Sequence, residues 1–106
     1  MKKTYNHTCQ VRGCSETEVE AAHIRQHTLP DSVDNETNMW LLCCNHHKAF
    51  DYSRMIVEDD GSFVRYNHDG TVREHDFIIY DDNHKVNATY IRKSREHHVR
   101  KRQEMD

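Results

Sequence analysis

Apolar residues occur in short runs separated by polar stretches. Residues 18–24 alternate weakly between polar and apolar positions, which predicts a strand. Residues 38–42 (N-M-W-L-L) form the most apolar stretch and predict a short buried strand. Between these segments, residues 25–36 are polar and include the only proline, so we expect a loop there.

Helical character follows the second predicted strand. Residues 46–53 predict a helix on which Ala49 and Phe50 can face a core. Trp40, in the preceding strand, is expected to pack in the same core.

Three further segments predict short strands, at residues 55–58, 62–66 and 71–80. They are separated by Asp60-Gly61 and Asp69-Gly70, dipeptides that favour tight hairpin turns. This part of the chain, residues 55–82, is therefore expected to form a β-meander.

The C-terminal segment, residues 87–104, contains neither glycine nor proline and is rich in Arg, Lys, Glu and Gln, which predicts a helix. Ile91 and Val99 are expected to form its sparse apolar side. Because no repeat and no long linker interrupts the chain, residues 1–106 are expected to form a single α+β domain.

The composition is unusually polar for a folded domain. Of the 106 residues, 35% are hydrophobic and 31% charged, and the four cysteines and ten histidines form an unusually large set of metal-binding side chains. A chain this short buries a smaller share of its surface than a large domain and often needs a disulfide, a structural metal or a partner chain. We therefore expect a bound metal ion.

The expected compartment supports a metal over disulfides. No apolar run approaches the ~20 residues that span a bilayer, and polar residues follow the basic start of the chain where a signal peptide would be apolar. We expect a cytoplasmic protein, in which disulfides are rare and Cys/His clusters usually bind metal. A secreted disulfide-bonded protein is the alternative.

Positive charge is concentrated near the C-terminus. The formal net charge is −3, but the eleven residues 92–102 hold six basic residues against Glu96. Clustered basic groups matter more for nucleic-acid binding than net charge. The candidate nucleic-acid-binding residues are Arg92, Lys93, Arg95, Arg100, Lys101 and Arg102.

The cysteine spacing predicts a structural zinc site. Cys9 and Cys14 form one close pair, and Cys43 and His46 form another where a strand gives way to a helix. Tetrahedral zinc is commonly held by two such pairs. Cys44 is an alternative to Cys43, and four free thiols in the core are the alternative to a metal site.

A second group of residues suits phosphodiester cleavage. Cleavage requires a base that deprotonates water, for which a neutral imidazole is suited, and a cation that stabilises the charge on the phosphate. His47 and Asp51 are four residues apart, so they share one face of the predicted helix and can hold such a cation. His23 precedes them in the A-H-I string of the first predicted strand.

With Asn38 fifteen residues after His23 and His47 nine residues further on, residues 9–63 resemble the HNH (His-Asn-His) endonucleases of the ββα-metal fold, in particular their zinc-containing members. The resemblance implies a zinc-stabilised ββα core over about residues 9–54, followed by the meander and the basic helix. It also implies that His23 is the general base, that Asn38 fixes the connecting loop, and that His47 and Asp51 bind the catalytic cation. Family members leave 5′-phosphate and 3′-hydroxyl ends.

One position departs from the family pattern. Many members carry Asp or His directly before the base, as a metal ligand, and this chain has Ala22. Glu20, two residues earlier on the same strand face, is a possible replacement. A sparse ligand set suits Mg²⁺, or another divalent cation such as Mn²⁺ or Ni²⁺, better than tightly bound zinc. An inactive zinc module that binds DNA or a protein is one alternative function, and a ribonuclease or toxin is another.

The expected substrate is double-stranded DNA, with specificity supplied by a homodimer, a partner protein or the hairpin region. The remaining histidines in turns and in the basic tail are expected to be solvated or to face phosphate rather than to bind metal. They are His68, His75, His84, His97 and His98, whereas His7 and His27 flank the site in sequence.

Overall fold

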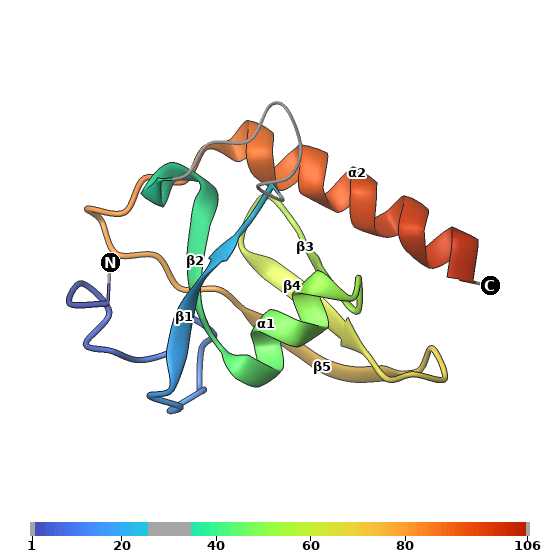
Figure 1. Ribbon diagram of the computed structural model, residues 1–106, viewed down its shortest axis with the longest axis horizontal. Coiled ribbons are helices and arrows are strands. Elements are labelled where there is room, and N and C mark those ends of the chain that lie inside the picture. The colour runs from blue at the N-terminus through green and yellow to red at the C-terminus, as the bar shows by residue number, and fades with distance from the viewer. Residues whose placement is uncertain (1, 26–34, 106) are drawn as a thin grey trace.

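A computed structural model describes residues 2–25 and 35–105 of the chain. It contains two β-sheets and two α-helices, and the predicted α+β fold is confirmed (Figure 1). Most of the predicted loop at residues 25–36, including His27, lies outside the described residues. No helix of the described part is long and apolar enough to cross a membrane.

The first sheet and the first helix form a ββα unit. Strands β1 (Val19–His23) and β2 (Met39–Cys43) pair in antiparallel fashion, with Ala22 opposite Trp40. A short 3₁₀ helix, η1 (Glu36–Asn38), leads into β2. Helix α1 (Cys44–Asp51) begins directly after β2, two residues earlier than predicted, and lies against both strands (Figure 1).

The second sheet is the predicted meander. Strands β3 (Met55–Val57), β4 (Ser62–Tyr66) and β5 (Val72–Phe77) are antiparallel neighbours in chain order. Both Asp-Gly turns have glycine at positive φ, and a Cβ at Gly61 would lie 3.0 Å from the Ile78 carbonyl oxygen. Strand β5 is shorter than predicted and ends at Phe77. The next residue, Ile78, pairs with Val11 of the N-terminal segment rather than with β4.

Helix α2 (Ala88–Met105) lies along one side of the molecule and contacts β3 (Figure 1). Its inward side differs from the prediction: Ile91 is buried, but Val99 is 39% exposed. The buried stripe instead continues through Ser94 and His98. At 3.6 residues per turn, a step of eight residues ends about 80° away from its start, whereas steps of three and seven stay on one face.

The core joins all of these elements around two aromatic side chains. Trp40 and Phe50 are at most 2% exposed and meet edge to face, with ring centroids 5.1 Å apart. Phe50 also contacts the His98 ring of α2, at 4.7 Å. The predicted burial of Trp40, Ala49 and Phe50 is confirmed. This packing fixes the ends of β2 and α1, where the candidate site residues lie.

Candidate metal centre and active site

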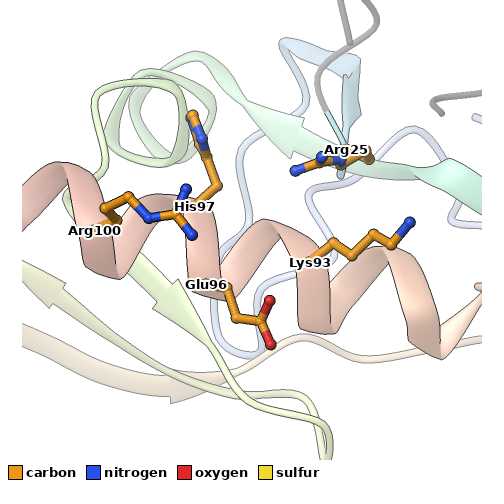
Figure 2. A pocket seen from close by; sticks show the side chains of 5 residues that line it. All are labelled: Arg25, Lys93, Glu96, His97 and Arg100. Atoms are coloured by element: carbon orange, nitrogen blue, oxygen red, sulfur yellow. The ribbon is translucent and has the colours of Figure 1, made fainter. Parts of the chain in front are cut away.

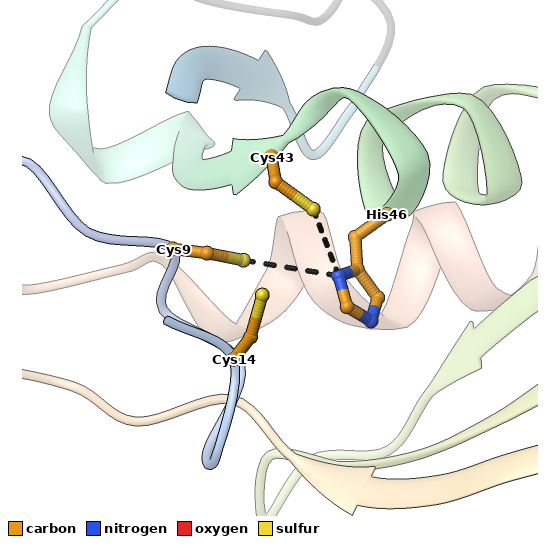
Figure 3. Close-up of side chains that lie close together, drawn as sticks. All are labelled: Cys9, Cys14, Cys43 and His46. Carbon is orange, nitrogen blue, oxygen red and sulfur yellow. Dashed lines mark hydrogen bonds between the residues drawn. The ribbon is translucent and has the colours of Figure 1, made fainter. Parts of the chain in front are cut away.

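Three cysteines and a histidine converge where the N-terminal segment meets the junction of β2 and α1 (Figure 3). The ligand atoms of Cys9, Cys14, Cys43 and His46 all lie within 4.8 Å of one another. His46 Nδ1 lies 3.1 Å from Cys43 Sγ and 3.8 Å from Cys9 Sγ. Cys44, the alternative to Cys43, is exposed and outside the cluster.

Local backbone structure presents the four side chains. The segment between Cys9 and Cys14 turns sharply, with Gly13 at a φ of 78° and the Cys14 N–H donating to the Val11 carbonyl at 3.0 Å. Cys43 is the last residue of β2, and His46 lies in the first turn of α1. A strand end and a helix start therefore face one tight turn, an arrangement common for tetrahedral sites.

The chemistry of this cluster suits a bound cation. Burial raises the pKa of Cys9 to about 12, and the nearby Cys43 and Cys14 add to the shift. Burial likewise raises the pKa of Cys14. Thiols so placed become metal-binding thiolates when a cation compensates the charge. The cluster can thus hold a metal ion, and among residues 2–25 and 35–105 no second group of three ligands is as tightly gathered.

Glu74 completes this centre and was not predicted from the sequence. Its Oε1 lies 2.8 Å from His46 Nε2, from the opposite side of the ring to the sulfur atoms. A carboxylate accepts from an imidazole N–H, so the contact keeps the proton on Nε2 and directs the Nδ1 lone pair at the cysteines. Glu74 lies in β5, and nothing in its local sequence signals this role.

A second constellation surrounds His47 on the exposed side of α1. Its Nδ1 lies 2.6 Å from Glu20 Oε1 of β1, and its Nε2 lies 3.2 Å from Asp51 Oδ2. The structure thus brings together the three residues considered as cation ligands. The two carboxylates contact opposite nitrogens of the ring, so a cation bound at one nitrogen would lie beside one carboxylate and would retain water.

His23 lies close enough to act on this group electrostatically. Burial raises the pKa of Asp51. The positive charge of His47 and of His23 opposes this shift, whereas the negative charge of Glu20 adds to it. His23 is partly buried and ends β1, next to the fully buried Ile24. Ala22 is also fully buried, and its methyl side chain has no metal-binding atom, so the position before His23 contributes no ligand.

The buried side chain of Asn38 fixes the backbone just after His23. Its Oδ1 accepts from the Arg25 N–H at 2.7 Å, and its Nδ2 donates to the Arg25 carbonyl at 2.9 Å. The Asn38 carbonyl in turn accepts from the Ile24 N–H. These contacts hold the end of β1 against η1 and restrict the backbone that carries His23.

Some of the basic residues predicted to bind nucleic acid on α2 contact other parts of the protein instead. Arg95 donates to Asp59 at 2.7 Å, a hydrogen bond that raises the pKa of its guanidinium. Arg102 stacks over Tyr66, with its guanidinium carbon 3.9 Å from the ring centroid. Both are thus occupied within the protein. Arg92, Arg100 and Lys101 are exposed, with Lys101 Nζ 3.8 Å from Glu104 Oε2, and Lys93 is partly buried.

Two histidines expected to be solvated are buried. His84 is 4% exposed and bridges Tyr5 Oη to the Glu36 carbonyl oxygen. His98 is 1% exposed and lies 2.6 Å from Ser53 Oγ. The prediction was wrong for both because these rings contact polar groups distant in sequence, which the local polarity of a turn or a basic helix does not reveal.

Comparison with known proteins agrees with this arrangement. Residues 9–58 match a family model described as HNH endonuclease. Over these residues, just under half of the chain, the sequence is similar to the HNH endonuclease family. The matched segment contains both the Cys/His cluster and the His23–His47 constellation, and the resemblance inferred from the sequence is confirmed. No curated protein matches the chain significantly.

A solved structure supports the same assignment over more of the chain. The chain is similar to a solved structure titled "Modification dependent TagI restriction endonuclease", with 28% identity and a TM-score of 0.66. The match covers 91% of this chain and 35% of the other, so it also includes most residues outside the matched family segment. This chain spans about a third of that larger enzyme.

Proposed function

We propose that this chain is a metal-dependent HNH endonuclease that hydrolyses phosphodiester bonds of double-stranded DNA. The observation that carries the proposal is the gathering of Glu20, His47 and Asp51 beside a His23 whose backbone Asn38 restrains. The family match and the restriction endonuclease title support nuclease activity and a DNA substrate.

Each residue has a distinct proposed task. His23 accepts a proton from the attacking water at a ring nitrogen, and Asn38 keeps that ring oriented. The water oxygen forms a bond to phosphorus while the bond to the 3′ oxygen breaks, and that oxygen takes a proton from solvent, which leaves 5′-phosphate and 3′-hydroxyl ends. His47 and Asp51, with Glu20 beside them, would hold Mg²⁺ or another divalent cation. When bound, such a cation neutralises charge on the phosphate and the leaving oxygen.

We further propose that zinc occupies the Cys9, Cys14, Cys43 and His46 cluster and stabilises the fold. Three thiolates and one imidazole form a typical structural zinc set. In the reducing cytoplasm, where we place the protein, these cysteines would stay available to metal. The whole chain would then act as one nuclease domain, with the zinc linking its N-terminal segment to the ββα unit.

Plasmid nicking tests the proposal. The wild-type protein should nick supercoiled plasmid when Mg²⁺, Mn²⁺ or Ni²⁺ is added and not when divalent cation is omitted; omission is preferable to chelation, which would also strip the cysteine cluster. His23→Ala should lose this activity, whereas His75→Ala, on the exposed surface of β5, should retain it. Full activity of folded His23→Ala protein would refute the role of His23.

A non-catalytic zinc module is the second candidate, and Ala22 is the observation that favours it. Because Ala22 is buried and supplies no ligand, the cation site is sparser than in many family members. Salt-sensitive binding of duplex DNA without nicking under any of the three cations would establish this alternative. Preferential cleavage of RNA in parallel assays would instead identify a ribonuclease.

A further inference from the structure

A pocket of ≈ 360 Å³ lies between α2 and the end of β1 (Figure 2). It is lined by Arg25 from the β1 end and by Lys93, Glu96, His97 and Arg100 from α2. Arg25 lies opposite His97 and Lys93, whereas the Glu96 side chain extends away from Arg25 (Figure 2). The space therefore contains three cationic side chains, one histidine and a single carboxylate directed away from Arg25.

The pocket is structurally linked to the candidate active site. Arg25 is two residues after His23, and the side chain of Asn38 holds the Arg25 backbone through two hydrogen bonds, of 2.7 and 2.9 Å. The same contacts that restrain the proposed base thus also position one wall of the pocket. A group bound there would lie on the strand end from which His23 is presented.

Electrostatics within the pocket favours an anion. Burial lowers the pKa of His97, and Arg25, Lys101 and Arg100 lower it further, while Glu104 opposes the shift. Several cations therefore act on one partly buried ring. Like charges so gathered repel one another, and a bound anion relieves that repulsion.

We propose that Arg25, Lys93, His97 and Arg100 form a subsite for a backbone phosphate of the DNA strand, next to the phosphodiester that is cleaved. This inference rests on the proposed nuclease function and narrows the phosphate-binding surface to one face of α2. Arg95 and Arg102 do not belong to it, since they contact Asp59 and Tyr66 instead. The subsite would position the strand without reading its sequence, as phosphate contacts do.

The salt dependence of DNA binding tests this subsite. A fluorescent duplex is titrated with protein at several salt concentrations, without added divalent cation and in a His23→Ala background that leaves the duplex intact. Arg100→Gln and Arg25→Gln should each weaken binding and reduce the slope of log affinity against log salt by about 0.9, the value for one phosphate contact. The matched control, Arg73→Gln, removes the same charge from an exposed position of β5 outside the pocket.

The control should keep the slope of the parent protein. Arg25→Lys should keep it as well, because it retains the charge at that position, and this variant separates loss of a phosphate contact from loss of structure. An unchanged slope in Arg100→Gln, or an equal decrease in Arg73→Gln, would overturn the subsite. Failure of the nuclease proposal would appear separately, as absence of cation-dependent nicking by the wild type, whatever the slopes show.

Discussion

Replacement of His98 by glutamine should flatten the pH dependence of the unfolding free energy in mildly acidic solution. The His98 ring is 1% exposed, packs against Phe50 and lies 2.6 Å from Ser53 Oγ. Burial, helped by the neighbouring His97, lowers its pKa to about 4. The ring is therefore neutral in the folded protein under conditions in which it becomes protonated in the unfolded chain.

The size and sign of the effect follow from this difference. With a pKa of about 6.5 in the unfolded chain, the unfolded state binds the proton first as the pH falls, so the stabilising contribution is complete above about pH 6.5 and declines towards about pH 4. From about pH 7.5 to about pH 5, the loss attributable to His98 is ~2 kcal/mol. Below about pH 4, where the folded state is protonated as well, the loss approaches ~3 kcal/mol, because the two pKa values differ by about 2.5 units.

Urea denaturation of the metal-loaded protein at several pH values measures this contribution. Wild type and His75→Gln, which removes an exposed imidazole from β5, should lose stability in parallel as the pH falls. His98→Gln should be less stable near neutral pH, because its packing against Phe50 is altered, but should lose ~2 kcal/mol less than wild type on acidification to about pH 5. A His98→Gln protein with the wild-type pH dependence would refute the proposed origin of the effect.

Two further predictions concern the cysteine cluster. Glu74→Gln should lower metal affinity by about 10- to 100-fold, since the amide no longer anchors the His46 ring as a carboxylate does; competition with a chromophoric chelator measures this, and unchanged affinity would remove Glu74 from the centre. Cys14→Ser should abolish stable metal binding, whereas Cys44→Ser, the matched exposed control, should retain about one zinc per chain in elemental analysis of the purified protein. Equal metal content in both variants would contradict the ligand set.

Several features of this protein follow from its sequence alone. The order and spacing of His23, Asn38 and His47 led to the HNH family, and the Cys9–Cys14 and Cys43–His46 pairs led to the metal cluster. Such features are accessible because they depend on residue type and on separations of a few residues within a strand, turn or helix. The two Asp-Gly hairpins were predictable for the same reason.

Other features arise only when distant segments meet. Glu74 contacts His46 across 28 residues of sequence. His98 is buried because its ring packs against Phe50 and lies within hydrogen-bond distance of Ser53 Oγ. Local polarity could not reveal these partners, since it says nothing about which surface a side chain faces after packing.

The basic segment shows this division most clearly. Its sequence established a helix with an excess of positive charge, but not how that charge is used. The fold pairs Arg95 with Asp59 and stacks Arg102 on Tyr66, and it leaves Lys93 and Arg100 lining a pocket with Arg25 from another element. Residue types thus determined which chemical groups are present, whereas the packing of α2 against the sheets decided which of them face one another.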